Sequence, residues 1–300
     1  MTAAHLVNVF TYRGQGGNPC PVVADASALS AEGMQAVAQH YGHESGFVLP
    51  ASSLDYDFAF RFWVPRHEME MCGHATIGAL WTLARTGALK AEQVRIETRS
   101  GPVTGYVDFA NADDPAVEIT QPAGKVVPLS RNEEEDVLAT LRITRSDLLD
   151  LPLQNAVTSR VKTLIPMKTT GHLDALMSEM KETEACCTRI GSTGLYPYAI
   201  DDHGARLFEA RQFPKSSGYP EDAATGIAAA ALAFGLLGNG LVEPLDRTIH
   251  IRQGRAMGRL SEIRVRLGFA AGRPIGCLLG GSVSWNEADA TRPDTGEARA

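Results

Sequence analysis

The sequence predicts a protein of mixed α and β structure built from two similar halves. The chain has 300 residues, about twice the length of a common domain. Short runs of alternating or clustered apolar and β-branched residues, typical of strands, are separated by helical patterns. One order of elements occurs twice, over 60–89 and 208–237: a strand, a proline-containing loop, a turn of small residues and an apolar helix. We therefore expect a duplicated fold whose halves face each other across a cleft.

In the first half, a helix is expected from Ser30 to Tyr41, because Ser30 is a good N-cap and Glu32 suits the positive end of the helix dipole. A second helix over 75–85 is apolar nearly all round and ends at Gly87, which predicts a central helix surrounded by other elements. The glycine-rich segment 14–19 is expected to be a hairpin turn. The expected strands are 6–12, 20–25, 45–50, 56–65, 94–100 and 103–109.

In the second half, aligning Ile77 with Ile227 places Asp222 opposite Cys72. Segments 249–267 and 191–200 then correspond to 94–108 and 42–49. Between the halves, 110–160 is the expected crossover, with a helix near 132–150 whose acidic run faces solvent. The adjacent Cys186 and Cys187 are expected on opposite faces of a strand.

These elements divide the chain into a first half over 1–115, a second half over 116–284 and a polar tail over 285–300. Whether the C-terminal segment packs onto the first half stays an open alternative.

The composition restricts the class of protein and of partner. With 44% hydrophobic and 21% charged residues, the chain is typical of soluble globular proteins. A net charge of -7 disfavours nucleic acid, and the longest apolar run, 223–237, is too short to span a bilayer. The N-terminus reads as a strand rather than a signal peptide, and five cysteines without a CxxC spacing indicate reduced thiols. We expect a cytoplasmic protein with a small-molecule partner, no membrane contact and no metal.

Each half carries a turn of small residues directly before its apolar helix, at 72–76 and 222–226. Small side chains leave the first backbone N–H groups of a helix accessible, and such groups attract a carboxylate or another anion. Two such turns at one cleft would hold an acidic substrate, whereas either turn alone could be an ordinary N-cap, for which Asp222 is suited. The candidate substrate-binding residues are Cys72, Gly73, Ala75, Ala223, Thr225, Gly226 and Ile227.

Glu44 is the candidate proton-transfer group. It lies among few other charges and shortly before the apolar run 47–50, in a partly apolar setting where the charged form of a carboxyl group is disfavoured. Such a group can donate and remove protons near neutral pH. His74 could pair with it or bind substrate. The alternatives are a surface glutamate and a structural histidine.

Cys72 has a second possible role. A thiol at a helix N-terminus is expected to have a lowered pKa and could be the base of a racemase. Such enzymes use two opposed thiols, and Asp222 at the opposite position disfavours that symmetry. The alternative is a small core residue. No nucleotide-binding, zinc-protease or serine-hydrolase motif occurs.

These residues together resemble the PhzF-like (phenazine biosynthesis) family, which has the diaminopimelate epimerase-like fold. The resemblance rests on five motifs in order: VNVFTYRGQGGNPCPVV, HYGHESGFVL, MCGHATIGA, GYPEDAATGIAAAAL and QGRAMGRLSEIRV. It implies an α+β fold of two pseudo-symmetric halves, each a β-barrel-like sheet wrapped around a central helix. It also implies an active site in the cleft and a homodimer.

The resemblance further implies that Glu44 shuttles the proton, that His74 and Asp222 assist and orient, and that no cofactor is used. Ile227 and Cys72 differ from the phenazine enzyme, which has a serine and a small non-thiol residue there, so a different substrate is expected. The predicted function is a cofactor-independent isomerase acting on a small carboxylate-bearing substrate. The alternatives are a racemase, epimerase or dehydratase using Cys72, and a non-catalytic protein that binds a small acid.

Overall fold

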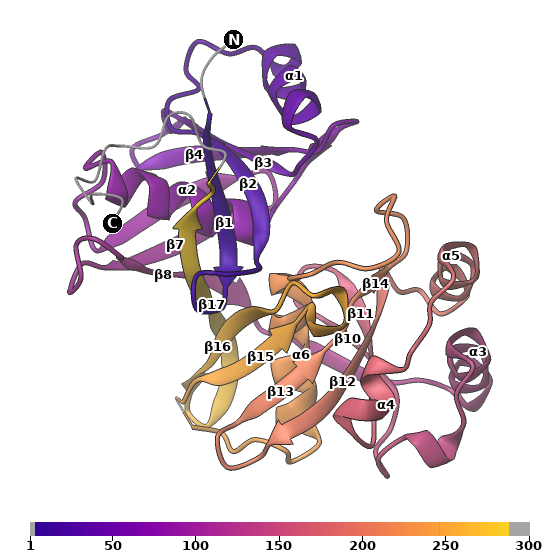
Figure 1. The fold of residues 1–300 in the computed structure, drawn as a ribbon. Coiled ribbons are helices and arrows are strands. Elements are labelled where there is room, and N and C mark those ends of the chain that lie inside the picture. Colours follow the sequence, from indigo (N-terminus) through magenta and orange to yellow (C-terminus); the bar gives the residue numbers. More distant parts are fainter. Residues whose placement is uncertain (1–3, 246, 288–300) are drawn as a thin grey trace, which may run out of the picture. The chain divides into compact units, whose positions relative to one another are not determined.

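The structure, a computed structural model, describes residues 4–245 and 247–287. The chain forms two compact units, which Figure 1 shows. Unit 1 holds the chain up to Ile119 together with the segment from Gly280 onward, and unit 2 holds Thr120–Leu279. From residue 288 onward, the expected polar tail lies outside the described residues.

Unit 1 is a closed barrel. Strand β1 pairs with β2, and the pairing continues through β3, β4, β6, β7 and β8. Strand β17 then pairs with both β8 and β1, which closes the ring. The strands are β1 (His5–Thr11), β2 (Asn18–Val23), β3 (Ser45–Leu49), β4 (Phe58–Trp63), β5 (Glu68–Met69), β6 (Gln93–Thr98), β7 (Gly101–Asp108), β8 (Ala116–Pro122) and β17 (Arg273–Trp285).

Helix α2 (Gly73–Arg85) fills this barrel, as its uniformly apolar sequence predicts. Every residue from Gly73 to Ala84 is buried. The helix approaches β1 closely at Gly78, where an added Cβ would lie 3.1 Å from a methyl group of Val9. Figure 1 shows α2 among β1, β2 and β7. The prediction of a central helix is confirmed.

Helix α1 (Ala31–Tyr41) sets the approach to β3. Its N-cap is Ser30, whose Oγ accepts a hydrogen bond from the Gly33 N–H at 3.2 Å, as predicted. The helix ends at Gly42, which has a left-handed φ of 72° and donates its N–H to Ala38 O. Since this conformation favours glycine, the helix stops here and Glu44 follows in a short connection to β3.

Unit 2 contains a second sheet around a second apolar helix, α6 (Gly226–Gly238). Figure 1 shows α6 behind β13 and β15. Strands β9 and β10 begin a pairing order that continues through β11, β12, β13, β15 and β16. The strands are β9 (Lys125–Pro128), β10 (Gln154–Val157), β11 (Val161–Pro166), β12 (Gly194–Asp202), β13 (Leu207–Ala210), β14 (Phe213–Pro214), β15 (Ile249–Gln253) and β16 (Ser261–Ala270).

The two units repeat the same sequence of strand pairings. From β1 to β7, successive pairs are antiparallel, parallel, antiparallel, parallel and antiparallel. From β10 to β16 the order is identical. The two central helices have the same length of 13 residues. The predicted α+β class with two pseudo-symmetric halves is confirmed.

Several details differ from the predictions. Cys186 and Cys187 lie in helix α5 (Met180–Arg189), not in a strand, and both are fully buried because adjacent helical residues can share one broad buried face. The helix expected near 132–150 is α3 (Arg131–Leu141), which stops early because Arg142 is left-handed. A 3₁₀ turn at Arg145–Asp147 and the short helix α4 (Thr170–Asp174) follow.

None of the helices in the described ranges is both long and apolar enough to cross a membrane.

Candidate active site

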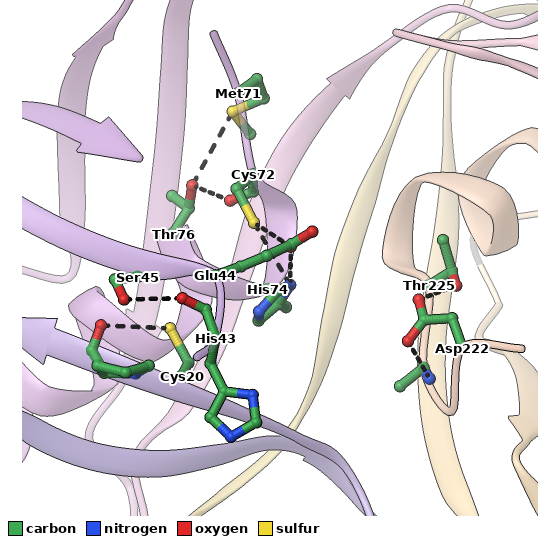
Figure 2. Close-up of polar contacts among 12 residues, drawn as sticks. Cys20, His43, Glu44, Ser45, Met71, Cys72, His74, Thr76, Asp222 and Thr225 are labelled. Carbon is green, nitrogen blue, oxygen red and sulfur yellow. Dashed lines mark hydrogen bonds and ion pairs between the residues drawn. The ribbon is translucent and has the colours of Figure 1, made fainter. Parts of the chain in front are cut away.

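Three side chains converge at the start of α2 in unit 1, as Figure 2 shows. The Cys72 Sγ lies 3.2 Å from the Glu44 Oε2 and 3.4 Å from the His74 Nδ1. The His74 Nδ1 lies 3.3 Å from the same Glu44 oxygen. The structure therefore brings Glu44, Cys72 and His74 into one cluster, each side chain within hydrogen-bonding reach of the other two.

The local fold positions this cluster without large loops. Cys72 is the N-cap of α2 and His74 is the second residue of that helix, so both are fixed by the same helical turn. Glu44 precedes β3, and β3 approaches α2 at Gly46, where an added Cβ would lie 3.2 Å from the Ala75 carbonyl oxygen. Because Gly46 has no side chain, the Glu44 segment can lie directly against the start of the helix.

Exposure separates the roles of the three side chains. The side chain of Glu44 is 33% exposed, that of His74 is 10% exposed, and Cys72 is 5% exposed as a residue. Of the three, Glu44 is therefore the group best able to reach a bound molecule. His74 and Cys72 lie behind it and can orient its carboxylate or exchange a proton with it.

The expectation that the helix N-terminus lowers the pKa of Cys72 is wrong. Burial, the negative charge of Glu44 and the nearby Cys20 raise the Cys72 pKa well above its ordinary value of 9.0. The partial positive charge of a helix end is small compared with the desolvation of a fully buried thiolate. Cys72 is therefore a thiol at neutral pH, and its S–H donates to Glu44.

The first N–H groups of α2 are open, as the small-residue turn predicts. No acceptor in the described part of the chain takes the N–H of Gly73 or His74. The intrahelical ladder begins with Thr76, whose N–H donates to Cys72 O at 3.0 Å. Both open donors lie beside the Glu44 cluster, and Ala75 is fully buried under them.

The corresponding turn of unit 2 precedes α6. Asp222 is not the helix N-cap; Thr225 is, and its side chain caps no backbone group of the helix. Instead, the Thr225 hydroxyl donates to the Asp222 carboxylate at 2.5 Å. When the starts of the two helices are matched, Cys72 therefore corresponds to Thr225. The sequence alignment had matched Cys72 to Asp222, which lies three residues earlier in the chain.

The turn also leaves donors open at the start of α6. Within the described ranges, the N–H groups of Gly226 and Ile227 have no acceptor, and the first helical bonds are those of Ala228 and Ala229 to Thr225 O. Ala223 is buried beneath the turn, and Ile227 is partly exposed. This unit thus offers a carboxylate and two open N–H donors close together in the chain.

Sequence reasoning missed Gln253, which holds this turn in place. Gln253 is fully buried at the end of β15. Its Nε2 donates to Asp222 O at 2.7 Å and to the Thr225 hydroxyl at 3.2 Å. Its Oε1 accepts from the Tyr196 hydroxyl at 3.0 Å and from the Thr225 N–H at 3.3 Å. The one available signal was a polar residue at an inward position of an alternating strand.

A buried ion pair supports the same turn from the preceding residue. Arg211 bonds Glu221 through two hydrogen bonds of 2.9 and 2.7 Å. It also donates to three backbone carbonyl groups, those of Leu173, Asp174 and Leu176. Because Glu221 directly precedes Asp222, this pair restricts where the Asp222 carboxylate can lie.

Comparison with known proteins agrees with this architecture. The family described as "Phenazine biosynthesis-like protein" matches residues 7–275. The chain belongs to this family. It is 29% identical over 281 residues to "Uncharacterized isomerase YddE" of Escherichia coli, covering 92% of this chain and 93% of that protein.

Two solved structures have a fold similar to that of this chain. The phenazine biosynthesis protein of the PhzF family from Bacillus anthracis has a TM-score of 0.83 at 22% identity, over 94% of this chain and 96% of that one. A hydroxyproline epimerase from Agrobacterium vitis has a TM-score of 0.63 at 15% identity, over 94% and 90%. The predicted family, its epimerase-like fold and the isomerase class are confirmed at this level; no substrate is identified.

Proposed function

We propose that the protein is a cofactor-independent isomerase that moves a proton on a small carboxylate-bearing substrate. The single observation that supports this is the Glu44 cluster: a one-third exposed carboxylate held within 3.3 Å of both a buried thiol and a buried imidazole. A carboxylate fixed in this way can take a proton from one carbon and return it at another. The buried partners keep its orientation during the transfer.

In this proposal Glu44 abstracts a proton from an acidified C–H bond, becomes a neutral carboxylic acid, and delivers the same proton to a second carbon. The electron pair of the broken bond moves through the conjugated substrate, so the net charge is unchanged. His74, through Nδ1, and Cys72, through its S–H, stabilise the carboxylate before the transfer and release it afterwards.

Substrate binding is assigned to the two helix starts. The open N–H groups of Gly73 and His74 in unit 1, and of Gly226 and Ile227 in unit 2, suit the carboxylate of a substrate. We propose that the two turns face one cleft between the units, where Asp222 orients the substrate. Ile227 supplies an apolar contact, which favours a substrate different from that of the phenazine enzyme.

The acidic composition and five buried free thiols suit a cytoplasmic protein, proposed to act as a homodimer.

The test is Glu44→Gln, which removes the base and keeps the size and the polar contacts. The protein is incubated with a library of small carboxylates in deuterated water, and incorporated label is measured by mass spectrometry. We expect the wild-type protein to label at least one compound, and Glu44→Gln to lose labelling by about 10²- to 10⁴-fold with an unchanged melting temperature. Glu70→Gln, an exposed glutamate near the same turn, is the matched control. Full labelling by Glu44→Gln would refute the mechanism.

An epimerase or dehydratase that uses Cys72 is the second candidate, and the 3.2 Å contact between its Sγ and Glu44 favours it. With its raised pKa, Cys72 would stay protonated and donate a proton to the substrate, beside Glu44 as the group that removes one. Cys72→Ala would then abolish turnover. In the leading proposal, the same substitution reduces turnover only partly. A protein that only binds a small acid would show ligand binding and no deuterium incorporation.

A further inference from the structure

We propose that Glu44, Cys72 and His74 form a three-ligand site for a soft divalent cation such as Zn²⁺, and that the bound ion blocks the proton transfer. The ligand atoms are a thiol sulfur, an imidazole nitrogen and a carboxylate oxygen, all within 4.8 Å of one another. These are the three side-chain types that bind zinc in proteins. The binding part of this inference stands alone, whereas the blocking part rests on the proposed function.

The spacing of the three atoms agrees with a zinc coordination sphere. With usual bond lengths and tetrahedral angles, the S–N, S–O and N–O separations would be about 3.5, 3.6 and 3.4 Å. The structure has 3.4, 3.2 and 3.3 Å for the same pairs. An ion lying just outside the plane of the three atoms would therefore need a shift of no more than about 0.4 Å, which the partly exposed Glu44 side chain can supply. The fourth position would hold water.

Charge balance favours the ion at this buried position. Binding replaces the thiol proton of Cys72 by a metal–sulfur bond, the proton leaves to solvent, and no atom changes oxidation state. The site then contains a dication, a thiolate, a carboxylate and a neutral imidazole, with a net charge of zero. A neutral ion cluster avoids the desolvation cost of an unpaired buried charge. The partial positive charge of the α2 N-terminus opposes the cation weakly, compared with two full negative charges.

The site is already organised before any ion binds. Cys72 and His74 belong to the first turn of a fully buried helix, and the Gly46 contact holds the Glu44 segment against it. The Nδ1 of His74, which faces both Cys72 and Glu44, is the ring nitrogen that would bind the ion. Little ordering entropy remains to be lost when the ion binds.

The binding test uses Co²⁺, which takes zinc sites and reports its ligands in its absorption spectrum. We expect the reduced full-length protein to bind one Co²⁺ and to show a thiolate-to-cobalt charge-transfer band in the near ultraviolet, lost on addition of Zn²⁺. Cys72→Ser should lose this band and bind at least about 100-fold more weakly, since even the loss of an outer partner costs 10- to 100-fold. Cys277→Ala, which removes another buried cysteine, should retain it.

Absence of the band in the wild-type protein at millimolar Co²⁺, or its persistence in Cys72→Ser, would overturn the proposed site. Glu44→Gln provides a second check, because it should weaken binding and leave the charge-transfer band at saturation.

The inhibition test measures deuterium incorporation with and without stoichiometric Zn²⁺, followed by a chelator. Loss of labelling that the chelator reverses supports the block. If zinc binds and labelling is unchanged, the proposed inhibition is wrong, whereas the proposed metal site stands. If the metal-free protein labels no compound, the result counts against the proposed function instead.

Discussion

Gln253 connects β15 to the turn that carries Asp222, so its removal should loosen unit 2 at that turn. The change that isolates its polar contacts is Gln253→Met, which keeps the volume of the side chain and removes both polar atoms. Four groups then lose a partner: the Tyr196 hydroxyl, the Thr225 N–H, the Thr225 hydroxyl and the Asp222 carbonyl.

The cost follows from the burial of those groups. The Tyr196 hydroxyl is fully buried, and burial raises its pKa, with the nearby Asp222 charge adding to the effect. Leaving one such group unsatisfied costs about 1–3 kcal/mol, and each of the two backbone bonds contributes about 0.5–1.5 kcal/mol. We expect Gln253→Met to lower the free energy of unfolding by about 2–6 kcal/mol.

A double-mutant cycle with Tyr196→Phe separates the stranded hydroxyl from the other losses. In the double variant the hydroxyl is absent, so the combined cost should be smaller than the sum of the single costs by about 1–2 kcal/mol. The assay is urea unfolding followed by circular dichroism. Tryptophan fluorescence follows the unfolding of unit 1 for comparison, because Trp63, Trp81 and Trp285 all belong to that unit. The reasoning would be refuted if the costs of the two single variants added up in the double variant. It would also be refuted if Gln253→Met lowered the free energy of unfolding by less than about 0.5 kcal/mol.

Two further predictions concern other sites. The hydrogen bond and charge of Arg61 hold the pKa of Glu68 below its ordinary value of 4.5, so this pair stabilises the fold above about pH 4.5 and loses its effect as the pH falls. Glu68→Gln should therefore lower the melting temperature at pH 7, by the equivalent of about 1 kcal/mol or less, and have no effect near pH 3; an equal effect at both values would contradict this. Gly124→Ala should cost about 1–3 kcal/mol in urea unfolding, because its Cβ would lie 2.4 Å from the Phe234 ring, whereas Gly238→Ala, with open space around it, should be neutral or slightly stabilising. Equal effects of the two glycine variants would contradict the packing argument.

Local patterns were enough to predict the elements that position the candidate site. Ser30 and Gly42 are the observed limits of α1, because a side-chain cap and a left-handed glycine are local properties. The uniformly apolar helix at 75–85 could be recognised as central because no polar face was available for solvent. Glu44, Cys72 and His74 were selected one by one, and the structure brings all three together.

Other features depend on contacts between residues distant in the sequence. Cys186 and Cys187 lie in a helix that packs on the β12 side of unit 2, and no local signal separated this from a strand. Gln253 reaches Asp222 across 31 residues, so its role follows only from strand pairing. The three-residue difference between the alignment and the helix starts has the same origin, since the length of a loop is not encoded in the periodicity of the helix that follows.

By itself, the sequence determined the duplication, the two central helices, the family and the small set of polar residues beside the helix starts. These features depend on the spacing and size of neighbouring side chains. Only the tertiary structure decided the protonation of Cys72, because the same helix start that would lower its pKa in water is enclosed by the barrel and faces the Glu44 carboxylate. Desolvation depends on everything packed around a group, and the order of residues along the chain does not contain that information.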